Sequence, residues 1–181
     1  GYKSTSFMLN LGSRFDTKNV IDMSRMFGSC GINNITFSLE LGSKFDTSNV
    51  KSMFAMFQGV GYKSKKFHLN LGEKFDTSNV TNMMNMFTDT GRESSNFMLD
   101  LGDKFDTSNV TNLMNMFVTT GYATDNLVLD LSNLSFDSVV DYTHFINTKT
   151  TTTIYVKSEV EKKWIIDKNF TGVNSNNVIV K

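Results

Sequence analysis

The hexapeptide FDTSNV, or a close copy of it, returns every 30 residues along the chain. It begins at Phe15, Phe45, Phe75 and Phe105. A constant period of this length is the sequence signature of repeat architectures, in which each unit buries its apolar side against the next unit. We therefore expect a row of similar units rather than one irregular core.

The first half of each repeat has the pattern of a half-buried strand. In the segment FHLNL, Phe67, Leu69 and Leu71 alternate with His68 and Asn70. Successive side chains on a strand point to opposite faces, so this alternation gives one apolar face and one polar face.

The second half of each repeat has the spacing of an amphipathic helix. Val80, Met83, Met86 and Phe87 lie at i, i+3, i+6 and i+7, which places them on one stripe of an α-helix. The preceding residues 76–78 carry side-chain oxygens of the kind that cap a helix N-terminus. The Met and Phe residues are therefore predicted to form the core.

These two halves predict an α/β fold, a leucine-rich-repeat-like solenoid of about five 30-residue strand–helix coils. The coils begin near residues 7, 37, 67, 97 and 127. Parallel strands stack about 4.8 Å apart and helices about 10 Å apart, so the parallel sheet is expected on the concave face.

The chain is predicted to consist of two parts. Residues 1–147 form the repeat solenoid, and residues 148–181 form a C-terminal cap of strand, helix and strand. Ser158 and Glu161 have the spacing of a capping box at the start of that helix. The N-terminal GYKS matches residues 61–64, so further repeats are expected ahead of the first residue.

Composition argues against several classes of function. Eighteen basic residues balance eighteen acidic ones, so no net field draws in nucleic acid or an anionic membrane. The single Cys30 allows no intrachain disulfide, and His68 and His144 lack the spacing of a zinc motif. The sequence has no apolar run of ~18 residues, no serine–histidine–acid set and no phosphate-binding glycine loop. We expect no enzyme, no cofactor, no metal and no direct membrane insertion.

The order of these motifs resembles a known repeat family. The LxL strand, FDTSNV and NMxxMF, clearest in residues 69–87 and 99–117, are similar to the BspA-like leucine-rich-repeat surface proteins, also described as the DUF285 or mycoplasma surface protein repeat. The resemblance covers about residues 7–147, with a period longer than that family's usual one. It implies a curved solenoid that is extracellular or on the cell surface of a bacterium or protist, often a low-GC Gram-positive or a mycoplasma, with adhesive roles towards host matrix proteins.

Positions that change from repeat to repeat are predicted to serve binding, because stacking requires the fixed ones. On the polar side of the strands they form columns on the expected concave face, an extended surface of the type that repeat proteins use for recognition. Simple solvation of these columns is the alternative. The predicted binding residues are Met8, Asn10, Ser38, Glu40, Lys66, His68, Asn70, Met98, Asp100, Val128 and Asp130.

The preferred function is a non-catalytic binding or adhesion module that recognises a protein or glycan of a host or neighbouring cell. The rival is a structural spacer or an assembly unit of a cell-surface layer or fibre. Three weaker hypotheses concern the ladders. The acidic strip is a poor calcium site, because a flat sheet rarely supplies roughly six to eight converging oxygens. The basic ladder of residues 14, 44, 74 and 104 is either neutralised by the nearby aspartates or binds a polyanion. The threonines of FDTSNV suit ice binding only if they are exposed.

Overall fold

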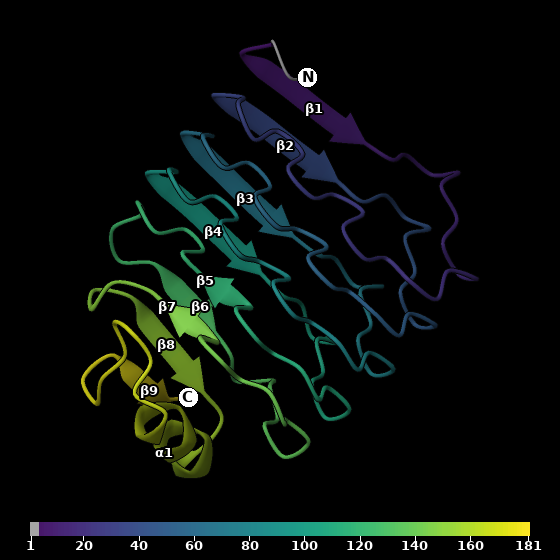
Figure 1. Cartoon of the computed structure of the whole chain (residues 1–181). Helices are drawn as coiled ribbons and strands as arrows, with labels where there is room; N and C mark the ends of the chain where they lie inside the picture. The colour runs from purple at the N-terminus through teal and green to yellow at the C-terminus, as the bar shows by residue number, and fades with distance from the viewer. Residues whose placement is uncertain (1–3) are drawn as a thin grey trace.

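The computed structural model describes residues 4–181, and the protein is α/β with mostly parallel strands and few helices. Successive repeats lie side by side, with the N-terminus at one end of the row and the C-terminus at the other (Figure 1). The first sheet contains, in sequence order, β1 (Ser6–Asn10), β2 (Thr36–Glu40), β3 (Lys66–Asn70) and β4 (Asn96–Asp100). A two-stranded sheet pairs β5 (Phe117–Val118) with β7 (Ile146–Asn147), and a third sheet contains β6 (Val128–Asp130), β8 (Thr153–Val156) and β9 (Val178–Val180).

The strands of the first sheet stack in the register that the 30-residue period requires. Phe7 of β1 lies opposite Phe37 of β2, and Phe67 of β3 lies opposite Phe97 of β4. The Phe and Leu side chains of β2 and β3 are buried, whereas the residues between them point outward. The predicted half-buried strands are confirmed.

The second half of each repeat is not a helix, so the predicted strand–helix coil is wrong. Residues 82–91 contain a run of consecutive turns instead. The N–H groups of Met83, Asn85 and Phe87 donate to carbonyls of the next repeat at 2.8–3.0 Å. The N–H groups between them bond within the turns, as Met86 does to the carbonyl of Met83 at 3.1 Å. The segment is therefore held by its neighbour rather than by its own helical hydrogen bonds.

The helix-like spacing of the apolar residues arises from these turns. In a turn closed by a hydrogen bond between residues i and i+3, the side chains of these two residues lie on the same side of the chain. A helix places residues three apart on one side in the same way. Asn85 and Asp89 adopt a left-handed backbone conformation with φ of 59°, and Ala55 does so with φ of 53°. Each such residue costs about 1–2 kcal/mol and prevents a right-handed helix, and the hydrogen bonds to the next repeat offset this cost.

Backbone hydrogen bonds join both halves of a repeat to its neighbour, so both halves have the spacing of hydrogen-bonded chains, about 4.8 Å. In the second half, single bridges pair Asp22 with Ser52, Ser52 with Asn82 and Asn82 with Asn112. The mismatch between closely spaced strands and widely spaced helices is absent. Because the expectation of a concave sheet face depended on this mismatch, its physical reason no longer applies.

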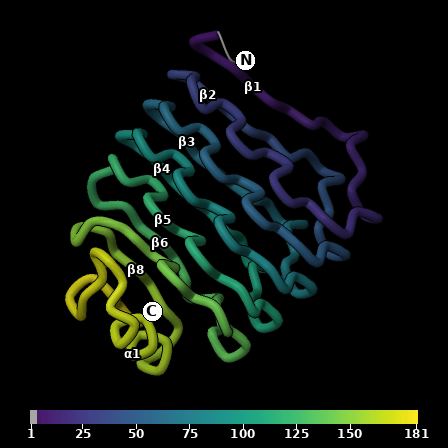
Figure 2. Tube along the Cα trace, viewed as in Figure 1, coloured from purple at the N-terminus to yellow at the C-terminus, as the bar shows by residue number. Residues whose placement is uncertain are grey.

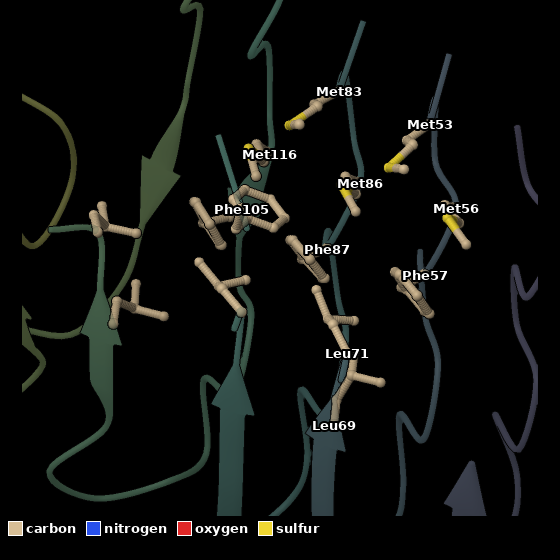
Figure 3. Close-up of a cluster of buried hydrophobic side chains, with 14 of the residues drawn as sticks. Met53, Met56, Phe57, Leu69, Leu71, Met83, Met86, Phe87, Phe105 and Met116 are labelled. Atoms are coloured by element: carbon tan, nitrogen blue, oxygen red, sulfur yellow. The ribbon is translucent and has the colours of Figure 1, made fainter. Parts of the chain in front are cut away.

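The methionine and phenylalanine ladders form the core, as predicted. Met83 and Met86 are fully buried, and Figure 3 shows the Met and Phe side chains of neighbouring repeats in rows. The Phe87 ring stacks on Phe57 at 5.6 Å and on Phe117 at 5.5 Å between centroids. Each repeat therefore completes the apolar surface of the next one.

The FDTSNV motif connects neighbouring repeats. The buried Thr77 hydroxyl donates to the carbonyl of Asp106 at 2.6 Å and accepts from the Asp106 N–H at 2.7 Å. Asp76 accepts from the N–H of Ser78 at 2.9 Å, and the Asn79 amide donates to a carbonyl of the preceding repeat at 2.9 Å. The same hydroxyl bridge recurs at Thr17, Thr47 and Thr107. All four threonines are buried, which rules them out as an ice-binding array.

The C-terminal segment continues the strand stacking and covers one end of the core. The helix α1 (Glu159–Asp167) follows β8 and lies at the C-terminal end of the row (Figure 2). Ser158 caps it by accepting from the N–H of Val160 at 3.1 Å, and the Ser158 hydroxyl also contacts Glu161. Trp164 stacks on Phe136 at 4.3 Å between ring centroids. The predicted capping pair and the strand–helix–strand order are confirmed.

Candidate binding face

The side chains that point outward from the strands form one extended surface, called here the sheet face. Strand register places the predicted binding residues of β1 to β4 on it together, and those of β6 lie beside them, because Met98 and Val128 line the same hollow. One row contains Met8, Ser38, His68, Met98 and Val128, the next contains Asn10, Glu40, Asn70, Asp100 and Asp130, and Lys66 begins β3 beside them. All are exposed except Ser38 and Asp130, which are partly buried.

The Asn and Asp row has a structural task that the sequence argument did not assign. The Asn70 side-chain oxygen accepts from the N–H of Gly72 at 2.8 Å, and Asp100 accepts from Gly102 at 3.0 Å. These bonds turn the chain as it leaves each strand. The expectation that variable positions are free of a structural role is therefore wrong for the Asn and Asp members of this row, because either side chain can make the turn. Glu40 makes no such turn bond.

The other row is unconstrained. Met8, Met98 and Val128 are 64%, 56% and 46% exposed. Within residues 4–181, no hydrogen bond or ion pair engages the imidazole side chain of His68. These side chains are available to a partner without loss of a contact within the protein.

A depression lies where the first and third sheets meet. No ladder joins β4 to β6, and the N–H of Phe97 donates to the hydroxyl of Thr124 at 2.9 Å rather than to a backbone carbonyl. A hollow of about 400 Å³ lies there, and a second of about 340 Å³ adjoins it. Their lining includes Asn96, Met98, Asn126 and Val128 in the first, and His68, Met98, Asp100, Asp103 and Asp130 in the second.

Several carboxylates lie near the C-terminal ends of these strands. Glu73, Asp100 and Asp103 line a third hollow beside Lys104. Asp130 forms an ion pair with Lys181. Partial burial raises the pKa of Asp130, but hydrogen bonds from Lys181 and Ser132 outweigh it, and the pKa lies below its ordinary value. Carboxylates and basic side chains therefore lie close together at this end of the sheet face.

The sheet face extends further than the sequence argument placed it. β8 and β9 add Thr153, Tyr155 and Ile179 in continuous register, and Lys181 follows with its ammonium 5.6 Å from the Tyr155 ring. Thr153 pairs with a residue only 25 positions earlier, so a search at a period of 30 misses it. The alternating pattern of TIYV and VIV is the signal that points to these strands.

No group of three or more His, Cys, Asp or Glu side chains in residues 4–181 is placed to hold a metal ion. Cys30 is a partly buried free thiol, and burial raises its pKa.

No helix within residues 4–181 has the length and apolar character needed to cross a membrane.

The repeat pattern also matches a known family. The family described as "Mycoplasma protein of unknown function, DUF285" matches residues 2–71 and residues 33–159, which together span most of the chain. The chain belongs to the DUF285 family. Two overlapping matches are expected of a tandem repeat, because one stretch aligns to the family in more than one phase. No curated protein and no solved structure matches the chain.

The DUF285 match reaches beyond the predicted repeat boundary at residue 147. It includes β8 and the first residue of α1. The family likeness thus extends into the segment that covers the end of the core.

Proposed function

We propose that this DUF285 protein is a non-catalytic binding module, exposed outside the cell or on its surface, whose sheet face recognises a protein or glycan of a host or neighbouring cell. The supporting observation is a contrast between two sides of the same strands. The buried positions of β3, Phe67 and Leu69, are also Phe and Leu in β2 and β4, because these side chains stack in the core. The outward row, in contrast, changes from Ser38 to His68 to Met98. A constant scaffold with a variable exposed row is the arrangement that repeat proteins use for recognition.

The finer architecture is part of this proposal. We interpret the row of repeats as a solenoid of the BspA-like leucine-rich-repeat kind, with a C-terminal cap that begins near residue 148. Register stacking at a 30-residue period and the DUF285 match support this interpretation. The resemblance to bacterial surface proteins supports the location, including a low-GC bacterial source.

The proposal is tested by removing side chains of the sheet face that make no turn. The combined variant Lys66→Ala, His68→Ala, Met98→Ala and Val128→Ala alters exposed residues only. Purified matrix proteins (fibronectin, laminin and collagen) and a glycan array serve as probes in surface plasmon resonance. We expect at least a tenfold loss of affinity for any probe that the unmodified protein binds, with the unfolding temperature unchanged.

The matched control is Lys63→Ala with Glu93→Ala, two exposed residues that lie outside the strands. This control should bind each probe as the unmodified protein does. Full binding by the sheet-face variant, or equal loss in the control, contradicts recognition through this face.

The structural alternative has an observation in its favour. Backbone hydrogen bonds and stacked Phe57, Phe87 and Phe117 rings run through the repeats, which makes a stiff body suited to a spacer or a surface-layer unit. This alternative predicts filaments or sheets in electron micrographs of the purified protein and normal assembly by the sheet-face variant.

A further inference from the structure

The main chain directly after β4 lacks a hydrogen bond that the neighbouring strands make. After β3, the N–H of Leu71 donates to the carbonyl of Asp100 at 3.1 Å. After β6, the N–H of Leu131 donates to the carbonyl of Tyr155 at 2.9 Å. The equivalent N–H of Leu101 has no hydrogen-bond partner within residues 4–181. The main-chain ladder between repeats is therefore interrupted between β4 and β6.

Two rows of main-chain groups face this interruption. Alternate residues of a strand direct their N–H and C=O groups to opposite neighbours. Because the carbonyl of Asp100 accepts from the β3 side, Leu99 directs its main-chain groups towards β6. Because Leu131 bonds to β8, Val128 and Asp130 direct theirs towards β4. Within residues 4–181, the main-chain groups of Leu99, Val128 and Asp130 have no hydrogen-bond partner.

The interruption begins at the turn ahead of β6. Asn126 adopts a left-handed conformation with φ of 54°. The equivalent Lys66 and Asn96 are the first residues of β3 and β4. Asparagine adopts this conformation more readily than most residues, so the turn is compatible with its sequence. The strand therefore begins only at Val128, and the chain enters it along a different path.

Side chains hold the turn in this form. The Thr124 hydroxyl accepts from the N–H of Phe97 at 2.9 Å and donates to the carbonyl of Ser94 at 2.8 Å. Lys149, in the loop ahead of β8, forms an ion pair of 3.2 Å with Asp125. The two strands are thus joined by a side chain where they begin, and their main-chain groups beyond that point stay unpaired.

The junction between β2 and β3 shows what a less complete interruption looks like. There the N–H of Phe37 also donates to a side chain, the hydroxyl of Ser64, at 3.2 Å. The N–H of Lys65 nevertheless donates to the carbonyl of Ile35 at 3.0 Å, and the strands still form one sheet. β4 and β6 have no such main-chain bond and belong to different sheets.

The opening between β4 and β6, called here the slot, matches an extended polypeptide. It contains the hollow of about 400 Å³, a volume typical of ligand sites. Its two sides present N–H donors and C=O acceptors in alternation, which the main chain of an extended segment complements. The exposed Met98 and Val128 side chains line it and offer apolar contacts. The ring in its lining, Phe97, is 3% exposed, so a sugar finds no aromatic surface to stack on.

The adjoining hollow of about 340 Å³ indicates the charge of such a segment. Its lining contains the carboxylates of Asp100, Asp103 and Asp130, and no Lys or Arg of residues 4–181. Asp130 pairs with Lys181, whereas Asp100 and Asp103 form no ion pair in the described chain. A segment that continues from the slot into this hollow is favoured when it carries a basic residue there.

We propose that the slot binds an extended segment of a partner protein, whose main chain hydrogen-bonds to Leu99, Val128 and Asp130 and whose basic side chain lies near Asp100 and Asp103. Main-chain pairing of this kind supplies affinity, and the side chains around it supply selectivity. The inference rests on the proposed recognition by the sheet face, and it selects a protein segment over a glycan as the ligand.

The probe is a peptide selected by the unmodified protein from a phage-displayed library of short random peptides. We expect the recovered peptides to contain a Lys or Arg next to apolar residues. In the complex, the amides of Leu99, Leu101 and Val128 should exchange hydrogen at least tenfold more slowly than in the free protein, because they gain acceptors. N-methylation of the central peptide residues should weaken binding at least tenfold.

Two variants at one position separate the main chain from the side chain. Val128→Pro removes an N–H that faces the slot and leaves the bonds to β8, which use Leu127 and Leu131. Val128→Ala shortens the same side chain and keeps the N–H. The proline variant should bind the selected peptide at least tenfold more weakly than the alanine variant, while the β8 amides remain protected in both.

Three results overturn the proposal: no peptide enriched above a selection on the proline variant, unchanged exchange at Leu99 and Leu101 in the complex, or equal binding by the two Val128 variants. The exchange measurement uses the unmodified protein, so it decides the question even if the proline variant does not fold. A glycan or matrix protein that the combined sheet-face variant loses, but that both Val128 variants bind equally, refutes the slot and leaves recognition by the sheet face intact.

Discussion

At the scale of the residue, single polar atoms connect one repeat to the next. The Thr77 hydroxyl satisfies both the N–H and the carbonyl of Asp106, in a buried position. A buried polar group that loses its partner costs more free energy than the hydrogen bond contributes on average. Threonine is therefore required in this motif for the hydrogen-bonding capacity of its side chain and not for its exposure.

Thr77→Val keeps the shape of this side chain and removes the bridge. We expect the free energy of unfolding to fall by about 1–3 kcal/mol, because two backbone groups of Asp106 lose their partner. Urea denaturation measures the change. Thr81→Val is the control, since Thr81 is exposed and its hydroxyl makes one long bond of 3.3 Å. Equal effects at the two positions contradict the bridging role.

Two glycines separate backbone conformation from packing. Gly61 and Gly72 both have positive φ, 59° and 79°. A Cβ atom added at Gly61 would lie 2.6 Å from Cδ1 of Phe67. A Cβ atom added at Gly72 would have no atom of the surrounding residues within 4 Å. Gly72→Ala should cost about 1 kcal/mol for the left-handed conformation alone. Gly61→Ala should cost about 1–3 kcal/mol more, because the core ring must move. Calorimetric unfolding that ranks the two variants otherwise contradicts this assignment.

At the scale of the element, two kinds of segment meet the same core. The turns of residues 82–91 have no hydrogen-bonding pattern of their own that extends beyond one turn, so their neighbours hold them in place. The helix α1 has its own cap at Ser158 and one fully buried residue, Ile165. It depends on the rest of the molecule mainly through the side chains that face the last repeat.

The two faces of α1 predict different costs for shortening a side chain. Ile165 is fully buried, and Val160 is 75% exposed on the same helix. Ile165→Ala should lower the free energy of unfolding by about 2–5 kcal/mol through the lost burial and the cavity. Val160→Ala should change it by less than about 0.5 kcal/mol. Chemical denaturation compares them, and a similar cost for both means that α1 does not pack as described.

At the scale of the whole molecule, the repeats form one row, and α1 packs against the last repeat of that row. Hydrogen bonds, apolar contacts and the sheet face all extend along the same direction, so a change in one repeat is felt first by its two neighbours. Several carboxylates along the row accept a hydrogen bond in a turn, cap a helix or pair with a lysine, so they add a common response to acid.

Stability should decline in acid. Hydrogen bonds from Ser24, Ser48 and Ser158 lower the pKa values of Asp22, Asp46 and Glu161, respectively. In the unfolded chain these carboxylates have their ordinary pKa values of 3.8 for Asp and 4.5 for Glu. As the pH falls below about 4, the unfolded chain therefore takes up protons before the folded protein does. The contribution of these three carboxylates to folding stability is complete above that pH. It is lost as the pH falls through their lowered pKa values in the folded protein.

Unfolding temperatures measured from pH 6 to pH 2.5 should form a plateau and then decrease below pH 4. Asp46→Asn keeps an oxygen for the Ser48 N–H and removes one titrating group. Its decline should be shallower than that of the unmodified protein. A stability that rises on acidification, or an identical slope for the variant, contradicts the assignment.

Local patterns in the sequence were sufficient for the strands, the core and the helix cap. Alternation in FHLNL determines which side of β3 is buried, because a strand places successive residues on opposite faces wherever it pairs. The spacing of Met83, Met86 and Phe87 correctly marked them as core, although the element was wrong. The pair Ser158 and Glu161 identified the start of α1, because capping involves neighbours in the sequence.

Tertiary structure decided the turns and the extent of the sheet face. The N–H of Asn85 finds its acceptor in the next repeat, and no pattern within one repeat distinguishes this bond from a helical one. Tyr155 joins the sheet face through pairing at a shorter period, and the hollow beside Met98 exists because β4 and β6 do not pair. The sequence by itself determined which side chains are buried, because burial follows local periodicity. Hydrogen-bond partners 24 to 30 residues away decided the rest, because a backbone group bonds to whichever group the packed neighbours bring within reach.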